Sequence, residues 1–468
     1  MRQSITELTV HGRTHHYIQS VERLSSGSYQ ETPEMNEPGP DSLPKASDAK
    51  TVENALNVLG SRQNKNLLAR LLPFLGPAFI ASVAYVDPGN FATNIQGGAQ
   101  FGYLLLWVIV ASNLMAMLIQ TLSAKLGLVT GTNLAEHCRE HFPKPVVIGM
   151  WVVMEIVAMS TDLAEFLGAA LGFQLLMGVP LFIGALLTGL ATVLILGLER
   201  FGFRPLEAVI SAMVALIALC YLLETTIVRP DPIQVLHSIF VPRFAGAESV
   251  FLACGILGAT VMPHAIFLHS ALMQGRIVVR DPARLKSLYR FEIADVVIAM
   301  GIASCVNAAM LMMAATTFYQ TGHTSVATIE EAYRTLEPLM GSAARWIFGL
   351  SLLVSGLSSS TVGTSAGQVI MQGFLSMHIP IWIRRLVTMA PPLAVIAWGL
   401  DPTRTLVVSQ VVLSFGLPFA VIPLVMFTSR RDIMGDMVNR RSTTAAAGFI
   451  AAIIVVLNIY LIYKTVAG

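Results

Sequence analysis

A carboxylate and two helix-disturbing residues stand together inside the first long apolar run of the chain. The segment reads Asp87-Pro88-Gly89-Asn90, and Gly76-Pro77 precedes it within the same run. Proline lacks a backbone donor and glycine loosens a helix, so the run is expected to unwind here and free carbonyl oxygens. Unwound backbone in such a run persists where it lines a cavity or binds a ligand. The alternative is that Asp87 only caps a loop at a membrane surface.

The sixth apolar run is interrupted in a similar way by the segment 255–264, which contains glycines and a proline. Together the two interrupted runs offer the carboxylate of Asp87 and the amide of Asn90. They also offer free carbonyls near Ala259 and the thioether of Met262. Hard Mg²⁺ and Ca²⁺ prefer oxygen ligands, whereas a sulfur ligand favours first-row transition ions, so the set indicates Mn²⁺ or Fe²⁺. Because the chain has 22 methionines, core packing is the alternative for Met262.

Three carboxylates share one face of the third apolar run. Glu155, Asp162 and Glu165 are spaced so that, at about 100° per residue, they form one stripe along a helix. Such a stripe faces the interior of a helix bundle, where carboxyl groups bind and release protons, so it indicates a proton relay. The alternative is a set of structural ion pairs. Arg384 and Arg385, near the inner end of the ninth run, could serve either role.

Two further polar residues lie in apolar runs, and each has two possible interpretations. His264 follows the proline of the sixth run, and it either makes a structural hydrogen bond or titrates as the helix moves. Gln410, near the start of the tenth run, either faces the same cavity as Asp87 or makes an ordinary interhelical hydrogen bond.

The composition indicates what surrounds these residues. Of 468 residues, 54% are hydrophobic and 12% are charged, and the mean hydropathy is +0.66. Soluble proteins are about 25% charged, so a soluble enzyme is excluded. A net charge of +2 provides no field for binding nucleic acid. The four cysteines have neither metal-binding nor disulfide spacing, and no bound cofactor is expected.

Eleven apolar runs of about 20 residues or more are predicted to be transmembrane helices, because a helix of that length crosses a bilayer. They lie near residues 67–95, 102–128, 146–174, 178–198, 203–223, 248–275, 290–318, 344–376, 382–400, 404–428 and 443–465. Since the first and sixth are interrupted, helices 1–5 (67–223) and helices 6–10 (248–428) fit an inverted five-plus-five repeat with a site between the halves. The predicted transmembrane domain covers 65–466.

The distribution of basic residues supports this count. If the amino terminus is inside, the inner segments carry 19 lysines and arginines and the outer segments carry 6. Cytoplasmic loops show this bias, so we predict an N-in, C-out protein of the plasma or inner cell membrane. Residues 1–60 are rich in Ser, Glu, Pro and His and are predicted to form a disordered cytoplasmic tail.

Three segments occur together in one known family: Asp87-Pro88-Gly89-Asn90, Thr161-Asp162-Leu163-Ala164-Glu165 and Met262-Pro263-His264. Over residues 65–430 the chain resembles the Nramp family of proton-coupled divalent metal transporters. The resemblance implies an all-α integral membrane protein with a LeuT-like fold. Two positions depart from the family pattern, Ala265 in place of asparagine and Leu357 in place of glutamine. They are expected to affect coupling or gating rather than ion binding.

The resemblance also implies roles for single residues. The implied metal ligands are the side chains of Asp87, Asn90 and Met262, joined in some conformations by the carbonyls of Ala84 and Ala259 and by Gln410. The implied proton pathway consists of Glu155, Asp162, Glu165, His264, Arg384 and Arg385. We therefore expect proton-coupled import of Mn²⁺ or Fe²⁺ by alternating access, with metal ions, protons and the lipid bilayer as partners.

Two other transport functions stay open, and an enzyme is not expected. A sodium-coupled organic-solute symporter of the same architecture would carry small residues and hydroxyl groups near the breaks rather than Asp and Met. A passive divalent-metal channel differs in having no uphill transport. An intramembrane hydrolase needs a nucleophile with a base or a zinc motif, and Ser365 lacks a G-x-S-x-G frame.

Overall fold

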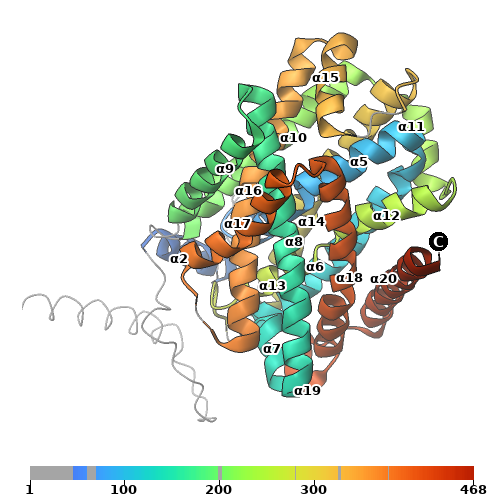
Figure 1. Cartoon of the computed structure of the whole chain (residues 1–468). Helices are drawn as coiled ribbons and strands as arrows, with labels where there is room; N and C mark the ends of the chain where they lie inside the picture. Colours follow the sequence, from blue (N-terminus) through green and yellow to red (C-terminus); the bar gives the residue numbers. More distant parts are fainter. Residues whose placement is uncertain are drawn as a thin grey trace, which may run out of the picture. The chain divides into compact units, whose positions relative to one another are not determined.

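The structure is a computed structural model that describes residues 46–60, 70–198, 203–279, 281–324, 328–377 and 379–467. Within these ranges it contains helices and connecting turns and no strand (Figure 1). Eight helical segments there are long and apolar enough to cross a membrane, and three shorter apolar helices accompany them.

The spans are built from thirteen α-helices and the 3₁₀ turn η2. They are α4 (Pro77–Val83), η2 (Ala84–Val86), α5 (Pro88–Phe101), α6 (Leu106–Thr130), α8 (Lys144–Met177), α9 (Leu181–Leu196), α10 (Phe203–Val228), α12 (Ala247–Thr260), α13 (Pro263–Leu272), α14 (Pro282–Ala314), α16 (Ser342–Leu375), α17 (Ile381–Ala397), α18 (Pro402–Thr428) and α20 (Arg441–Ala467). Shorter elements connect them: α2 (Ala46–Gly60), η3 (Gly102–Leu105), α7 (Leu134–His141), α11 (Pro232–Phe240), the π-helical turn η5 (Ala315–Tyr319), α15 (Ile329–Met340), α19 (Arg431–Met434) and η6 (Gly435–Met437).

Each of the eleven predicted spans contains a helix or a broken pair of helices. The first consists of α4, η2 and α5, and the sixth consists of α12 and α13. Gly102, with φ of 59°, separates α5 from the second span, because an L-residue with a side chain rarely adopts that conformation. Predicted and observed ends differ by a few residues, as for the third span, where α8 extends to Lys144 and Met177.

Two details of the prediction are wrong. Ala46–Gly60 form the helix α2, although a disordered tail was expected through residue 60; residues 1–45 lie outside the described residues. The helix forms because its apolar residues share one face, and Ala55 is buried with Phe74 and Leu288. Gly76 does not interrupt the first span but precedes it, since α4 begins at Pro77.

Several helices begin at an Asp-Pro pair. Asp87, Asp281 and Asp401 each cap the helix that follows, and each accepts a hydrogen bond from a backbone N–H of its first turn. Proline at the first helical position loses no hydrogen bond there, because the first N–H groups of a helix have no intrahelical partner. The helix that follows a break in a span therefore loses little stability at its first turn.

The two broken spans pack against each other in opposite directions. The first half of span one, α4, contacts α13, the second half of span six, and α5 contacts α12. This exchange is what an inverted repeat requires, and it brings both breaks to the same depth. Long helices surround the pair: α8 packs along α16, and α18 contacts α5, α8 and α12 (Figure 1).

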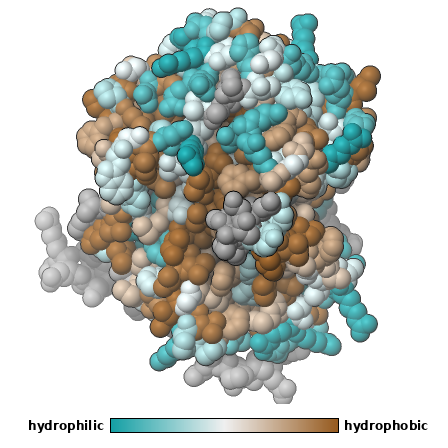
Figure 2. Space-filling view, turned by 45° about the vertical axis from the view of Figure 1, so that its right-hand side comes forward, coloured by the Kyte–Doolittle hydropathy of each residue, from teal (hydrophilic) through white to brown (hydrophobic). Residues whose placement is uncertain are grey.

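The outer surface matches a lipid environment. Figure 2 shows hydrophobic residues across the middle of the face in view, with hydrophilic residues toward its top and bottom. On α9, Phe182, Leu186, Leu190 and Leu194 recur every four residues and are each at least half exposed. Water would penalise such a stripe, whereas acyl chains do not. The chain is a multi-pass integral membrane protein.

Candidate functional site

The first break is organised by a single carboxylate. Asp87 is fully buried and lies between η2 and α5. Its Oδ1 accepts hydrogen bonds from the backbone N–H of Asn90 at 2.8 Å and from the Asn90 Nδ2 at 2.7 Å. Its Oδ2 has no hydrogen-bond partner among the described residues. Asp87 does cap a helix, but in the interior of the bundle rather than at a membrane surface.

The second break lies between α12 and α13 and meets the first directly. The Asn90 Nδ2 also donates to the carbonyl oxygen of Ala259 at 3.0 Å, which links α5 to α12. Helix α12 continues through its glycines to Thr260, so the unwound part is only Val261 and Met262. Met262 is fully buried and precedes Pro263 at the start of α13. The predicted grouping of Asp87, Asn90 and the Ala259 carbonyl is therefore observed.

Gln410 on α18 lies against both broken spans. A Cβ atom on Gly89 would lie 1.9 Å from the Gln410 Nε2, and one on Gly258 would lie 2.2 Å from the Gln410 carbonyl oxygen. Glycine at these two positions is what allows α18 to approach so closely. The side-chain amide donates to the Ser409 Oγ at 3.2 Å, while its Oε1 has no partner among the described residues.

The backbone carbonyls at the break in the first span accept hydrogen bonds from two residues that were not predicted as site residues. The Asn307 Nδ2 on α14 donates to the Tyr85 carbonyl at 2.7 Å, and the Ser355 Oγ on α16 donates to the Val86 carbonyl at 2.5 Å. Ala84 begins η2 and is buried. Asparagine in the apolar seventh run was the available signal, because buried polar groups in a membrane span usually have a defined partner.

The junction offers oxygen atoms and one thioether to a cation. Asp87 Oδ2, Asn90 Oδ1 and Gln410 Oε1 are buried and have no partner in the described part of the chain. Buried polar atoms are normally hydrogen-bonded, so three unpaired acceptors around one pair of helix breaks fit a cation site. Met262 adds a sulfur atom at the second break, and sulfur selects against Ca²⁺ and Mg²⁺.

The acidic stripe lies on α8 and faces inward as predicted. Asp162 and Glu165 are buried, and Glu155, nearer the start of the helix, is partly exposed. The Arg384 Nη2 on α17 donates to the Glu155 Oε1 at 3.0 Å. The ion-pair alternative is therefore observed for Glu155. The side chain of Arg385 lies outside the described residues.

Two glycines on α16 make room for this stripe. A Cβ atom on Gly363 would lie 2.3 Å from the Glu165 Oε2 and 3.1 Å from the Asp162 Oδ1. A Cβ atom on Gly367, one turn later, would lie 2.0 Å from the Arg384 Nη2. The carboxylates and the guanidinium therefore pack directly against two glycines of α16, where α8, α16 and α17 meet.

His264 connects the second break to the stripe. Its Nδ1 lies 3.2 Å from the Thr161 Oγ1, next to Asp162, and its Nε2 has no partner among the described residues. His269 does not join it: the His269 Nδ1 lies 2.9 Å from the Gln120 Oε1 on α6. The Gln120 Nε2 in turn donates to the Tyr85 hydroxyl at 2.6 Å.

Comparison with known proteins gives matches over most of the chain. Residues 78–464 match the family described as natural resistance-associated macrophage protein-like. The chain is 51% identical over 437 residues to the divalent metal cation transporter MntH of Deinococcus radiodurans, covering 93% of this chain and 99% of that protein. It is 52% identical over 395 residues to MntH of Bacillus subtilis, covering 84% and 93%.

Solved structures agree with the fold. The manganese transporter of Eremococcus coleocola matches with a TM-score of 0.79 and 33% identity, covering 87% of this chain and 90% of that one. The nucleobase-cation-symport-1 family transporter Mhp1 matches with a TM-score of 0.56 at 13% identity, covering 84% and 93%, which shows the fold alone. The predicted LeuT-like architecture is confirmed. From the family match and the identities over almost its whole length, the chain belongs to the Nramp family.

Proposed function

We propose that this protein imports divalent transition-metal ions, Mn²⁺ or Fe²⁺, by alternating access coupled to protons. The observation that carries the proposal is the junction of the two broken spans, where unpaired oxygens of Asp87 and Asn90 lie beside the break that holds Met262. The relatives are named as divalent metal cation and manganese transporters, which supports the same substrate class here.

The bound ion is proposed to contact Asp87, Asn90 and Met262 by side chain, with the carbonyls of Ala84 and Ala259 and the Gln410 amide joining as the helices move. In the present arrangement the Ala259 carbonyl and one Asp87 oxygen are occupied by Asn90. An arriving ion would replace those hydrogen bonds. Binding of the ion would therefore change the contact between α5 and α12, so that an occupied site can favour a different position of these helices.

Protons are proposed to travel from the junction along α8. His264 lies between the second break and Thr161, Asp162 follows Thr161 on α8, and both Asp162 and Glu165 lie beside Gly363 of α16. Glu155 with Arg384, and Arg385, would form the inner end of the route. Ionisable side chains that face the interior of a bundle within a span are typical of proton relays.

The protein is proposed to lie in the plasma or inner cell membrane with its amino terminus inside. Arg204 and Arg276 belong to two different inner segments in the count of basic residues, and both pair with Glu207, so these two segments lie at the same end of the bundle. A sodium-coupled organic-solute symporter fits less well, because Asp and Met stand at the breaks where hydroxyl groups and small residues would be expected. We propose no enzymatic reaction.

Transport in proteoliposomes with Met262→Ala tests the proposal. The unaltered protein should accumulate Mn²⁺ against its gradient only when an inward proton gradient is imposed. Met262→Ala should lower Mn²⁺ uptake and reduce the preference for Mn²⁺ over Ca²⁺ by about tenfold or more, since loss of the thioether leaves a set of oxygen ligands. Met300→Ala is the matched control, because Met300 is equally buried but lies in the core of α14.

Three results would contradict the proposal. Downhill movement alone, with or without a proton gradient, would indicate a channel. Uphill uptake driven by sodium would indicate the symporter. An unchanged preference for Mn²⁺ over Ca²⁺ in Met262→Ala would show that the Met262 sulfur does not select the ion.

A further inference from the structure

A second group of metal-binding side chains lies on the short helix α7, away from the junction. The helix begins with a capping box in which Asn133 and Glu136 each bond the other's backbone N–H. It lies at the same end of the bundle as α19 (Figure 1). His137 and His141 are four residues apart and Glu140 is three residues after His137, so all three share one turn.

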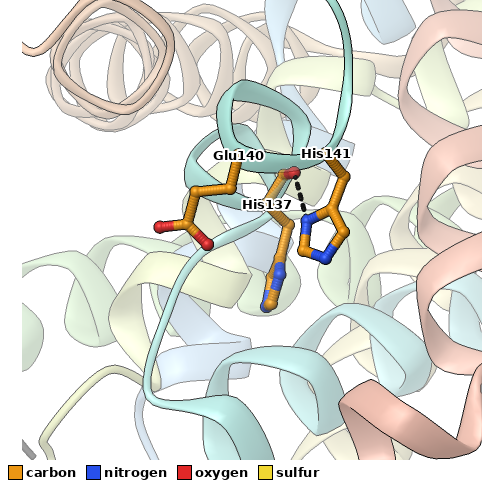
Figure 3. Close-up of side chains that lie close together, drawn as sticks. All are labelled: His137, Glu140 and His141. Carbon is orange, nitrogen blue, oxygen red and sulfur yellow. Dashed lines mark hydrogen bonds between the residues drawn. The ribbon is translucent and has the colours of Figure 1, made fainter.

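The three side chains are close enough to hold one ion. One ligand atom from each of His137, Glu140 and His141 lies within 4.8 Å of the others (Figure 3). Glu140 and His141 are exposed, so an ion can reach them, whereas His137 is only 5% exposed. In the described part of the chain this is the one group of three or more His, Cys, Asp or Glu residues with this spacing.

Each imidazole already has one of its two nitrogens engaged. The His141 Nδ1 donates to the His137 carbonyl at 3.0 Å, shown as the dashed line in Figure 3, which leaves Nε2 as the acceptor. The His137 Nε2 contacts the hydroxyls of Thr132 at 2.7 Å and Thr130 at 3.0 Å. Its Nδ1 is buried and has no hydrogen-bond partner among the described residues. Metal-binding histidines usually have this arrangement, with the second nitrogen fixed by a backbone or side-chain oxygen.

The helix that carries the group is itself well anchored. The Leu134 N–H donates to the Ser270 Oγ on α13 at 3.0 Å, and the Arg139 Nη1 donates to the Ser376 Oγ at 2.5 Å. Arg139 lies on a different face of α7 from the histidines, since it is two residues from each of them. The imidazoles also pack against Phe427 on α18. A rigid support of this kind favours a formed binding site over a chance cluster.

We propose that His137, Glu140 and His141 form a binding site for a divalent transition-metal ion that is separate from the transport junction. Two imidazoles and one carboxylate favour ions that prefer nitrogen ligands, such as Zn²⁺ or Co²⁺, over Mn²⁺. Three protein ligands leave room for water as a further ligand. The inference goes beyond the proposed transport and does not depend on it. In the proposed orientation the site faces the cytoplasm.

Calorimetric titration of the full-length protein with Zn²⁺, after removal of any polyhistidine tag, tests the inference. Asp87→Ala and Met262→Ala are combined as the parent, so that the junction does not contribute to the signal. The parent should bind one Zn²⁺ per chain. Glu140→Gln and His141→Gln should each weaken binding by about tenfold or more. His237→Gln, an exposed histidine on α11 outside this group, is the matched control and should leave the affinity unchanged.

Both altered ligands are exposed, so the variants should keep the fold, which an unchanged elution volume and thermal midpoint would verify. Co²⁺ gives a second readout, because its visible absorption bands report a nitrogen and oxygen site and should disappear in His141→Gln. The inference is overturned if the parent binds no Zn²⁺, or if Glu140→Gln and His141→Gln bind it as the parent does. Absence of Mn²⁺ transport by the unaltered protein would contradict the proposed function instead, and it would leave the Zn²⁺ result unaffected.

Discussion

Asp87 uses its two carboxylate oxygens for different purposes. Oδ1 accepts two hydrogen bonds from Asn90 and so fixes the start of α5, while Oδ2 has no partner among the described residues. An N-cap made by an acidic residue is stabilised by the positive end of the helix dipole. The carboxylate is thereby kept in place by its structural bond, and a free oxygen is left toward the junction. Asp87 can thus cap α5 with Oδ1 and offer Oδ2 as a ligand to an ion.

Substitution of Gly363 tests whether the carboxylates on α8 depend on the space that this glycine leaves. Gly363→Ala would place a methyl group 2.3 Å from the Glu165 Oε2, so this carboxylate must move. Overpacking of this kind costs about 1–3 kcal/mol. We therefore expect proton-coupled Mn²⁺ uptake to fall about tenfold or more, while the protein still folds and binds Mn²⁺. Uptake and internal acidification in proteoliposomes measure the effect.

Gly301→Ala on α14 is the control for this substitution. Its Cβ atom would have no described atom within 4 Å apart from its own helix and neighbours, and alanine favours helix over glycine by about 1 kcal/mol. That variant should transport normally. Normal transport by Gly363→Ala as well would show that proton transfer does not depend on the close contact between Gly363 and Glu165.

At the scale of single helices, α4 depends on a distant residue for its first turn. Gly76 precedes α4 and offers no side-chain cap. Instead, the Asp295 carboxylate on α14 accepts from the Gly76 N–H at 3.3 Å and from the Ala78 N–H at 2.9 Å. The first half of the broken first span is therefore attached to the seventh span through its helix end.

Asp295→Ala should lower the thermal stability of the purified protein. It leaves two buried N–H groups without their acceptor, which costs about 1–3 kcal/mol for each unsatisfied group. Asp295→Asn keeps one acceptor oxygen and should lose less. Asp432→Ala, which removes an exposed carboxylate paired with Arg430, is the control and should change little. Thermal midpoints in detergent measure all three, and equal midpoints for parent and Asp295→Ala would rule out the capping role.

The helices and their breaks could be predicted from the sequence because their causes are local. An apolar run of sufficient length specifies a span, and the proline after Asp87 or Met262 specifies where it breaks. Asp295, Asn307 and Ser355 could not be assigned in this way. Each bonds a backbone group more than 200 residues away, and only the packed structure brings the two together.

The helix α2 was missed for a related reason. Its sequence mixes polar and apolar residues and follows a long polar stretch, so it was included in the predicted tail, and its apolar face is small. That face is stabilised by residues of other segments, including Phe74 and Leu288. Tertiary burial therefore decides the structure of α2, as it often does for short helices with weak intrinsic preference.

At the scale of the whole bundle, charge and apolar surface are segregated into zones. Exposed leucines and phenylalanines occupy the sides, as on α9, and ion pairs such as Arg430 with Asp432 and Arg345 with Glu337 lie at the ends. A charged side chain in the middle of a span costs about 2.5–3.5 kcal/mol on insertion scales. Because the lipid-facing surface excludes charge, the few charged residues inside spans lie in the interior, where they either line the proposed route, as on α8, or make a structural contact, as Asp295 does.

The excess of basic residues at one end predicts how the bundle is oriented, and cysteine labelling can measure it. Gln320 follows η5 and Asp436 lies in η6, and both are exposed. With a membrane-impermeant maleimide, Gln320→Cys should react in intact cells. Asp436→Cys should react only after the cells are permeabilised, because its segment lies beside Arg430 and Arg431, which the positive-inside rule places in the cytoplasm. The parent, with its four native cysteines, sets the background. Reaction of Asp436→Cys in intact cells would contradict the N-in orientation, and with it the assignment of the inner end of the proton route.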